Sequence, residues 1–248
     1  MRAQPQFPNE QTDTGEFKRQ SDAFRHWVTE DGRSGYPAAA GRYHLYVSLA
    51  CPWAHRTIIV RALKGLTEVI GMTVVDPIRD DQGWAFHNGP GHSLDTTNGF
   101  HFLSEAYRAT DPNYHGRVTV PVLWDTVTKR IVTNSDDDLM RIFNGEFNRF
   151  TTSRLDLYPA ALRPQIDEMN DFVYERVNDG VYRAGFATSQ QVYERAARSV
   201  FVALDQLDTR LRDRRYLFGA QFVESDWRLF VTLLRFDAVY HGHFKCNL

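Results

Sequence analysis

A Cys-Pro pair between a short apolar segment and a helical pattern constrains the fold of this chain more than any other feature. Residues 43–49 (YHLYVSL) are aromatic and apolar, which is typical of a buried strand. Cys51 and Pro52 follow, and residues 54–64 then carry apolar side chains at helical spacing until Gly65, which is expected to end the helix. The sequence therefore predicts a strand, a cysteine turn and a helix in direct succession.

Further strands are predicted on either side of a long loop that is rich in glycine and histidine. They cover residues 68–75, 118–123 and 130–133, and a helix is expected to begin near Asp136. Antiparallel strands that follow a strand–helix–strand unit are typical of a thioredoxin-like α/β domain.

Beyond about Tyr158 the strand patterns end. Apolar side chains recur every three or four residues over 160–177, 189–214 and 224–240, which predicts an all-helical second domain. We therefore expect an N-terminal extension over residues 1–36, a thioredoxin-like domain over 37–145, a linker over 146–156 and an all-helical domain over 157–248.

Charge and composition limit the partners that this chain is expected to have. The 29 basic and 31 acidic side chains include no basic block, which predicts no binding to nucleic acid or to an anionic membrane. No window approaches the roughly 20 apolar residues of a membrane span, and the N-terminus lacks the pattern of a secretory signal. The two cysteines, Cys51 and Cys246, lie in different local contexts, so we expect reduced thiols and a cytoplasmic location.

Cys51 occupies the position where the first turn of the predicted helix presents unpaired backbone N–H groups. These groups and the helix dipole favour negative charge, so we expect the pKa of the thiol to be lowered. The thiolate is the form that attacks sulfur. Ala54 stands where a second cysteine of a dithiol motif would lie, which predicts a monothiol centre that an external thiol resolves. The alternative is that Cys51 is a small buried apolar residue.

The pair Val120-Pro121 is the second candidate site feature. Proline inside a strand is disfavoured unless the missing N–H is tolerated or the preceding peptide bond is cis. In a thioredoxin-like fold, a cis-proline beside the cysteine turn leaves the backbone of Val120 able to pair with the backbone of a bound peptide. The alternative is an edge-strand or turn proline.

Several longer motifs resemble one family, the Xi-class glutathione transferases, or glutathionyl-hydroquinone reductases. The resemblance begins near Gly15 and covers almost the whole chain. It rests on residues 51–56 (CPWAHR), 83–84 (GW), 116–125 (GRVTVPVLWD), 178–187 (NDGVYRAGFA), 234–237 (LRFD) and 243–246 (HFKC).

The resemblance implies an enzyme whose second domain is of the glutathione-transferase type, with glutathione as co-substrate and no metal. The Cys51 thiolate would attack the glutathione sulfur of an aromatic conjugate, releasing hydroquinone, and a second glutathione would restore the thiolate. Tyr182 matches a family tyrosine near the substrate and would bind or polarise the quinol oxygen; the alternative is a core tyrosine. The family also implies a homodimer.

The resemblance further implies a glutathione pocket. Arg117 can meet a carboxylate in a bidentate pair, although a solvated loop charge is the alternative for this residue. Trp84 would pack over the tripeptide. The remaining residues expected around the pocket are the backbone pair Val120 and Pro121, the helix start Pro52, and the wall residues Trp53 and His55.

One departure from the family lies where the γ-glutamyl group would bind. The family carries Glu-Ser at the start of the helix after the fourth strand, and this chain has Ser135-Asp136 in changed order. Ser135 could cap the helix and the Asp136 carboxylate could take the ligand ammonium. The alternative is that acidic residues here only complement the helix dipole, or that another thiol replaces glutathione.

Two other functions stay open on the sequence alone. One is an omega-type thiol transferase or dehydroascorbate reductase, which also uses a Cys-Pro turn. The other is a non-catalytic module of the glutathione-transferase type. Family members continue past the equivalent of Leu248, so we expect the helical domain to be truncated relative to the family.

Overall fold

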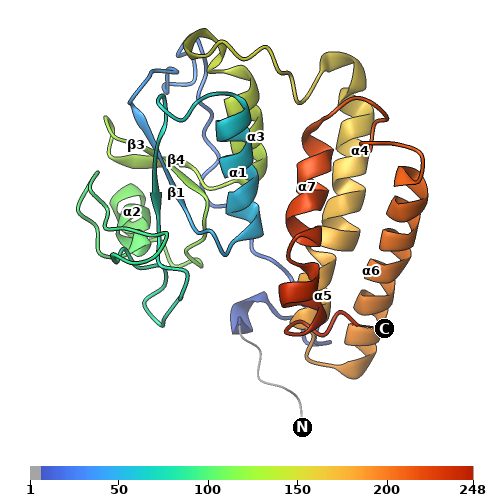
Figure 1. Cartoon of the computed structure of the whole chain (residues 1–248). Helices are drawn as coiled ribbons and strands as arrows, with labels where there is room; N and C mark the ends of the chain where they lie inside the picture. Colours follow the sequence, from blue (N-terminus) through green and yellow to red (C-terminus); the bar gives the residue numbers. More distant parts are fainter. Residues whose placement is uncertain (1–6, 248) are drawn as a thin grey trace. The chain divides into compact units, whose positions relative to one another are not determined.

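The computed structural model describes residues 7–247, so residues 1–6 of the expected N-terminal extension, and Leu248, lie outside the described residues (Figure 1). The chain divides into two compact units. A helical unit contains residues 7–20 and 157–247, and a sheet unit contains Ser21–Asp156. The expected extension is thus shared between the two units, and the four-part division expected from the sequence stays a prediction.

The sheet unit contains one mixed four-stranded sheet in the order β2-β1-β3-β4. β1 is parallel to β2 and antiparallel to β3, and β3 is antiparallel to β4. This arrangement confirms the thioredoxin-like α/β prediction. The strands are β1 (Tyr43–Val47), β2 (Gly71–Val74), β3 (Val122–Asp125) and β4 (Arg130–Thr133).

Three helices cover the two faces of this sheet (Figure 1). α1 (Pro52–Leu63) and α3 (Asp136–Gly145) lie on one face, and α2 (Leu103–Thr110) lies on the other. α1 begins at Pro52, because proline has the helical φ and needs no N–H partner at the first position. The helix ends before Gly65, which has φ +66°, a value that glycine adopts without strain.

The third strand differs from the sequence prediction. The segment 118–123 was expected to be a strand, but β3 begins only at Val122. The backbone of Thr119 instead bonds to the Tyr107 hydroxyl, which donates to the Thr119 carbonyl at 3.0 Å and accepts from the Thr119 N–H at 3.2 Å. Pro121 has no N–H with which to continue a ladder.

The same tyrosine lies on a helix that the sequence analysis missed. α2 lies inside what was expected to be one long loop, and it completes the covering of the sheet. Its signal was short: Leu103, Ala106 and Tyr107 are buried at helical spacing, and Glu105 accepts the backbone N–H of Phe102 at 2.8 Å. Eight residues are too few for periodicity to stand out.

The helical unit confirms the all-helical prediction, although its helices are shorter than expected. The segment 160–177 changes to a π-helical turn after Val173, and the segment 224–240 is interrupted after Leu233. Within residues 7–247 no helix is both long and apolar enough to cross a bilayer. The helices are α4 (Arg163–Val173), α5 (Gly180–Gly185), α6 (Gln190–Leu211) and α7 (Glu224–Leu233), with π-helical turns at Tyr174–Asn178 and Phe236–His241 and short 3-10 turns at Pro8–Glu10, Asn148–Phe150 and Ala160–Leu162.

Two buried clusters hold the helical unit together. One contains Val173, Val177 and Leu229 from α4, the π-helical turn and α7. The other contains Val181 and Val200 from α5 and α6. Each fully buried aliphatic side chain contributes about 1.5–3 kcal/mol relative to exposure. The first cluster therefore fixes α4 against α7, and the second fixes α5 against α6.

Candidate functional site

Cys51 is the residue that immediately precedes α1. Its backbone is extended, with φ −84° and ψ 119°, and its carbonyl accepts the N–H of His55 at 3.0 Å. The Cys51 thiol belongs to no disulfide and is half-buried. It therefore lies at the positive end of α1, where backbone N–H groups favour an anion.

The backbone before Pro121 lies next to this thiol. Cys51 Sγ is 3.6 Å from the carbonyl oxygen of Val120, and the Val120–Pro121 peptide bond is cis. Val120 is only 5% exposed, and its backbone carbonyl is the group that contacts the thiol. A carbonyl accepts from a protonated thiol and repels a thiolate, so another donor on this oxygen would favour ionisation of Cys51.

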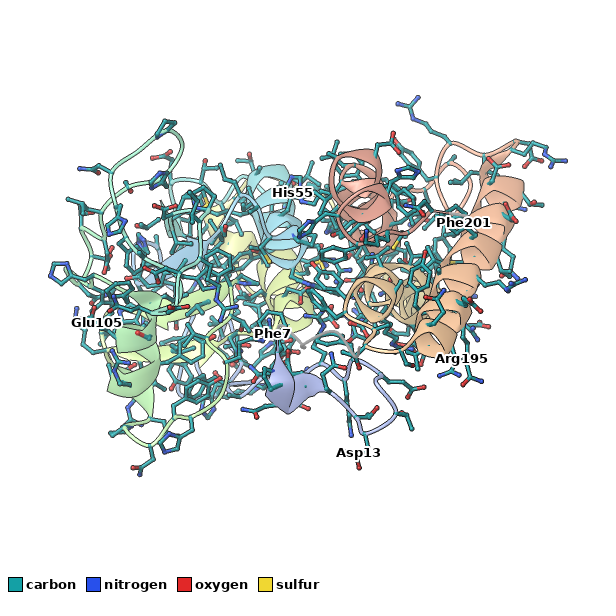
Figure 2. All side chains as sticks on the ribbon, turned by 90° about the horizontal axis from the view of Figure 1, so that it is seen from below. Phe7, Asp13, His55, Glu105, Arg195 and Phe201 are labelled. Carbon is teal, nitrogen blue, oxygen red and sulfur yellow. The ribbon has the colours of Figure 1, made fainter. Side chains whose placement is uncertain are left out.

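The first turn of α1 carries the other residues expected around the cysteine. Pro52 is buried, and Trp53 and His55 are half-buried; His55 is labelled on α1 in Figure 2. The guanidinium carbon of Arg56 lies 4.6 Å from the centre of the Trp53 ring, within the range of a cation–π contact. Arg56 therefore holds the ring of Trp53 in place.

Arg56 also joins α1 to the start of α3. Its side chain is 1% exposed, and its Nη1 donates to Asp136 Oδ2 at 2.9 Å and lies 3.6 Å from Asp137 Oδ1. Ser135 caps α3 by accepting the N–H of Asp138 at 3.3 Å. Both Ser135 and Asp136 thus have structural bonds at the position where a γ-glutamyl group was expected.

The N-terminal part of the sheet unit reaches the same helix start. Arg25 makes a bidentate pair with Asp138, at 2.8 and 2.6 Å. Asp22 hydrogen-bonds to Ser135, and desolvation together with the nearby Asp137 carboxylate raises the pKa of Asp22 to about 6. The sequence analysis missed both residues, since more than 100 positions separate them from α3 and no motif joins them.

Trp84 and Arg117 lie in the loops that flank α2. Trp84 is half-buried, and its carbonyl accepts the N–H of Leu103 at 2.9 Å, which ties this loop to the start of α2. The guanidinium carbon of Arg79 is 5.9 Å from the Trp84 ring. Arg117 is half-buried, and its carbonyl accepts the Tyr114 hydroxyl at 2.9 Å.

Tyr182 belongs to the helical unit, on α5. Its half-buried ring contacts Phe186, Tyr240 and Phe244, with ring centres 5.8, 6.0 and 5.2 Å away. The guanidinium carbon of Arg19 lies 4.6 Å from the ring centre. The sequence analysis did not identify Arg19, and no local pattern relates it to α5.

The structure thus brings together two pairs of elements within the sheet unit. Cys51 lies beside Val120, and the first turn of α1 is joined to α3 through Arg56 and Asp136. Among residues 7–247, no three His, Cys, Asp or Glu side chains are grouped closely enough to hold a metal ion. The chemistry available at Cys51 is that of a single thiol at a helix start.

Comparisons with known proteins identify relatives of both units. The family model described as glutathione S-transferase, N-terminal domain, matches residues 50–139, and the one described as glutathione S-transferase, C-terminal domain, matches residues 190–247. Glutathionyl-hydroquinone reductase YqjG of Escherichia coli is 49% identical over 240 residues, which cover 94% of this chain and 73% of that protein.

Solved structures are also similar to this chain over most of its length. The glutathione S-transferase Xi of Phanerochaete chrysosporium has a TM-score of 0.91 and 48% identity, covering 94% of this chain and 79% of that one. The glutathione-bound structure of YqjG has a TM-score of 0.88 and 49% identity, covering 90% of this chain and 75% of that one.

Proposed function

Because this chain belongs to the glutathione S-transferase family, among the Xi-class glutathionyl-hydroquinone reductases, we propose that it releases hydroquinones from their glutathione conjugates with Cys51 as nucleophile. The observation that carries the proposal is the half-buried Cys51 thiol at the start of α1, whose sulfur lies 3.6 Å from the Val120 carbonyl oxygen. The glutathione-bound YqjG structure supports glutathione as the co-substrate.

In the first step, the Cys51 thiolate attacks the glutathione sulfur of the aromatic thioether. A sulfur–sulfur bond forms and the carbon–sulfur bond breaks, so the arene leaves with the bonding electron pair and takes up a proton as hydroquinone. The product on the enzyme is a mixed disulfide between Cys51 and glutathione. The conjugate is thereby reduced and the two sulfurs are oxidised.

The Val120 carbonyl prepares the thiol for this attack. When the cysteine N–H of the bound tripeptide donates to that carbonyl, the oxygen becomes a weaker acceptor for the Cys51 thiol and repels a thiolate less. Both effects reduce the preference of Cys51 for its protonated form. Substrate binding then increases the thiolate fraction at the start of α1.

In the second step, a second glutathione thiolate attacks the glutathione sulfur of the mixed disulfide. Glutathione disulfide leaves and the Cys51 thiolate is restored. The chain has no nearby second cysteine in its turn, since Ala54 follows Trp53 in the motif. An external thiol is therefore the resolving reagent.

The residues expected from the resemblance take separate parts of the substrate. Tyr182 donates to the quinol oxygen, and Arg117 pairs with a glutathione carboxylate. Trp84 packs over the tripeptide. Trp53 and His55 form the pocket wall, and Val120-Pro121 contribute the backbone.

The changed Ser135-Asp136 pair holds the γ-glutamyl end. Two carboxylates, Asp136 and Asp137, face one guanidinium, Arg56. In the proposed complex, the Asp136 carboxylate attracts the ligand ammonium.

The test is hydroquinone release from a glutathionyl-hydroquinone in the presence of glutathione. The wild-type protein is expected to release free hydroquinone, and Cys51→Ser is expected to lose at least about 10²-fold in rate because the nucleophile is absent. With the conjugate alone, mass spectrometry is expected to find glutathione joined to Cys51.

Cys246→Ser is the matched control, since it removes the other thiol, and it is expected to release hydroquinone at the wild-type rate. If the wild-type protein released none, the proposed activity would be wrong. If Cys51→Ser remained fully active, Cys51 would not be the nucleophile.

A further inference from the structure

Arg19 makes a charged contact with the face of the Tyr182 ring. It lies in the N-terminal strap, residues 7–20 of the helical unit. Its guanidinium carbon is 4.6 Å from the centre of the Tyr182 ring, and its side chain is 19% exposed. A cation over an aromatic face within about 6 Å is attracted to the ring, and more strongly where water is largely excluded.

A buried carboxylate fixes the position of this guanidinium. Asp179, which precedes α5 and is 3% exposed, accepts Arg19 Nε at 2.9 Å and Arg183 Nε at 3.0 Å. Arg19 and Arg183 thus share one carboxylate, so Asp179 alone does not neutralise both guanidinium charges.

The N-terminal strap itself is held on the helical unit by bonds that do not involve Tyr182. Gln11 donates to the Phe186 carbonyl at 3.0 Å, and the Thr188 N–H donates to the Gly15 carbonyl at 3.1 Å. Phe17 is 4% exposed, with its ring centre 5.2 Å from that of Phe186. The backbone that carries Arg19 is therefore anchored independently of the ion pair.

We propose that Arg19 is a positioning residue for Tyr182, holding the ring by its face and making its hydroxyl a stronger proton donor. The inference rests on the proposed function, in which Tyr182 donates to the quinol oxygen. A fixed positive charge near a phenol favours its ionised form, and a more acidic phenol is a better hydrogen-bond donor and acid.

The electrostatics of Arg19 agree with this coupling. Burial lowers the pKa of Arg19, but the Asp179 carboxylate and the Tyr182 phenol raise it, so that it lies above its ordinary value. The coupling is reciprocal: if the Tyr182 phenolate stabilises the Arg19 charge, then the Arg19 charge stabilises the phenolate by the same amount.

The other titratable groups that face Tyr182 come from three segments. α6 contributes the phenol of Tyr193. The segment after α7 contributes the phenol of Tyr240 and the thiol of Cys246, whose pKa is raised to about 12 by burial. On its own element Tyr182 has the Asp179 and Arg183 pair described above.

A double-mutant cycle tests whether Arg19 acts through the Tyr182 hydroxyl. Arg19→Gln is expected to lower kcat for hydroquinone release on the order of 10-fold with little change in KM, and Arg19→Lys is expected to recover part of the loss. In a Tyr182→Phe background, Arg19→Gln is expected to have no further effect, because the hydroxyl is already absent. If Arg19→Gln lowered kcat by the same factor in the wild-type and Tyr182→Phe backgrounds, the inference would be overturned.

Arg195→Gln is the matched control for the N-terminal strap. Arg195, labelled on α6 in Figure 2, pairs with Glu16 of the strap. Its loss removes a strap anchor while leaving the Arg19 contact, so kcat is expected to stay near the wild-type value. An equal loss in Arg195→Gln would show that Arg19 only holds the strap, and would overturn the inference.

A measurement without turnover separates this inference from the proposed function. With 3-fluorotyrosine placed at position 182 alone, fluorine NMR follows the titration of that phenol. Arg19→Gln is expected to move the titration midpoint to higher pH, and Arg195→Gln to leave it unchanged. An unmoved midpoint in Arg19→Gln would overturn the inference, even in an active enzyme; a moved midpoint would support it even if no hydroquinone were released.

Discussion

The two cysteines show how position controls the chemistry of one side chain. Cys51 is half-buried at the start of α1. Cys246 is fully buried against α5, with Sγ 3.8 Å from the Val181 carbonyl, and burial raises its pKa to about 12. The helix start favours a thiolate, whereas burial among apolar side chains disfavours it.

We therefore expect iodoacetamide to alkylate one thiol per folded chain at neutral pH. Peptide mass spectrometry is expected to find the label on Cys51, because Cys246 has neither thiolate nor access. The Cys51→Ser variant is expected to take up label only after denaturation. Rapid labelling of Cys246 in the folded protein would contradict this prediction.

At the scale of elements, the starts of α1, α3 and α7 carry polar contacts that fix these helices. α1 begins beside Cys51 and α3 begins at Ser135, and Arg56 joins the two. α7 begins without a Ser or Thr cap, since Val223 occupies that position. Asp226 compensates by accepting two backbone N–H groups, from Val223 at 2.9 Å and Leu217 at 2.8 Å.

Asp226→Ala is expected to lower the free energy of unfolding of the helical unit by about 2 kcal/mol, because it leaves two partly buried donors without acceptors. Urea unfolding followed by circular dichroism measures the change. Asp213→Ala removes an 84% exposed aspartate near the end of α6, and is expected to change stability by less than about 0.5 kcal/mol. Equal losses in both variants would show that the cap contributes nothing specific.

Local patterns predicted some elements well and others poorly. The first strand, the Cys-Pro turn and α1 were predicted because periodicity, proline and glycine act within a few residues. α2 was missed because eight residues show too little periodicity. The segment 118–121 was wrongly expected to be a strand because its backbone partner is the Tyr107 hydroxyl, not a neighbouring strand.

At the scale of the whole molecule, long-range ion pairs close each unit. In the sheet unit, Arg42 before β1 makes a bidentate pair with Asp125 at the end of β3, at 2.8 and 2.7 Å. Asp125 is fully buried, and it also accepts from Thr128 and the Val127 N–H. Burial raises the pKa of Asp125, but the hydrogen bonds lower it by a larger amount. The net pKa of Asp125 therefore lies below its ordinary value.

This depressed pKa predicts a loss of stability in acid. The pair stabilises the fold fully above the unfolded-state pKa of about 3.9, and its contribution is lost as pH falls through the lower folded-state pKa. Asp125→Asn is expected to lower the free energy of unfolding by about 3 kcal/mol at neutral pH, because it leaves the Arg42 charge uncompensated. The same variant is expected to lose less stability than the wild type as the pH falls below about 4. Thermal unfolding across pH measures both effects.

Asp81→Asn, in an exposed loop, is the control for this variant and is expected to keep the wild-type pH profile. If Asp125→Asn lost stability with falling pH in the same way as the wild type, other carboxylates would be responsible for the loss of stability in acid.

The sequence by itself determined the two kinds of domain, the strand–cysteine–helix succession and the family, because each is written in residues that are neighbours along the chain. It also singled out Cys51, Val120 and Tyr182. Only the tertiary structure decided what surrounds them: Arg56 with Asp136, Arg25 with Asp138, and Arg19 with Tyr182. These partners lie 80 or more positions apart, and a charged side chain carries no local signal of the distant residue that will pair with it, so their contacts follow from the packing of the folded units.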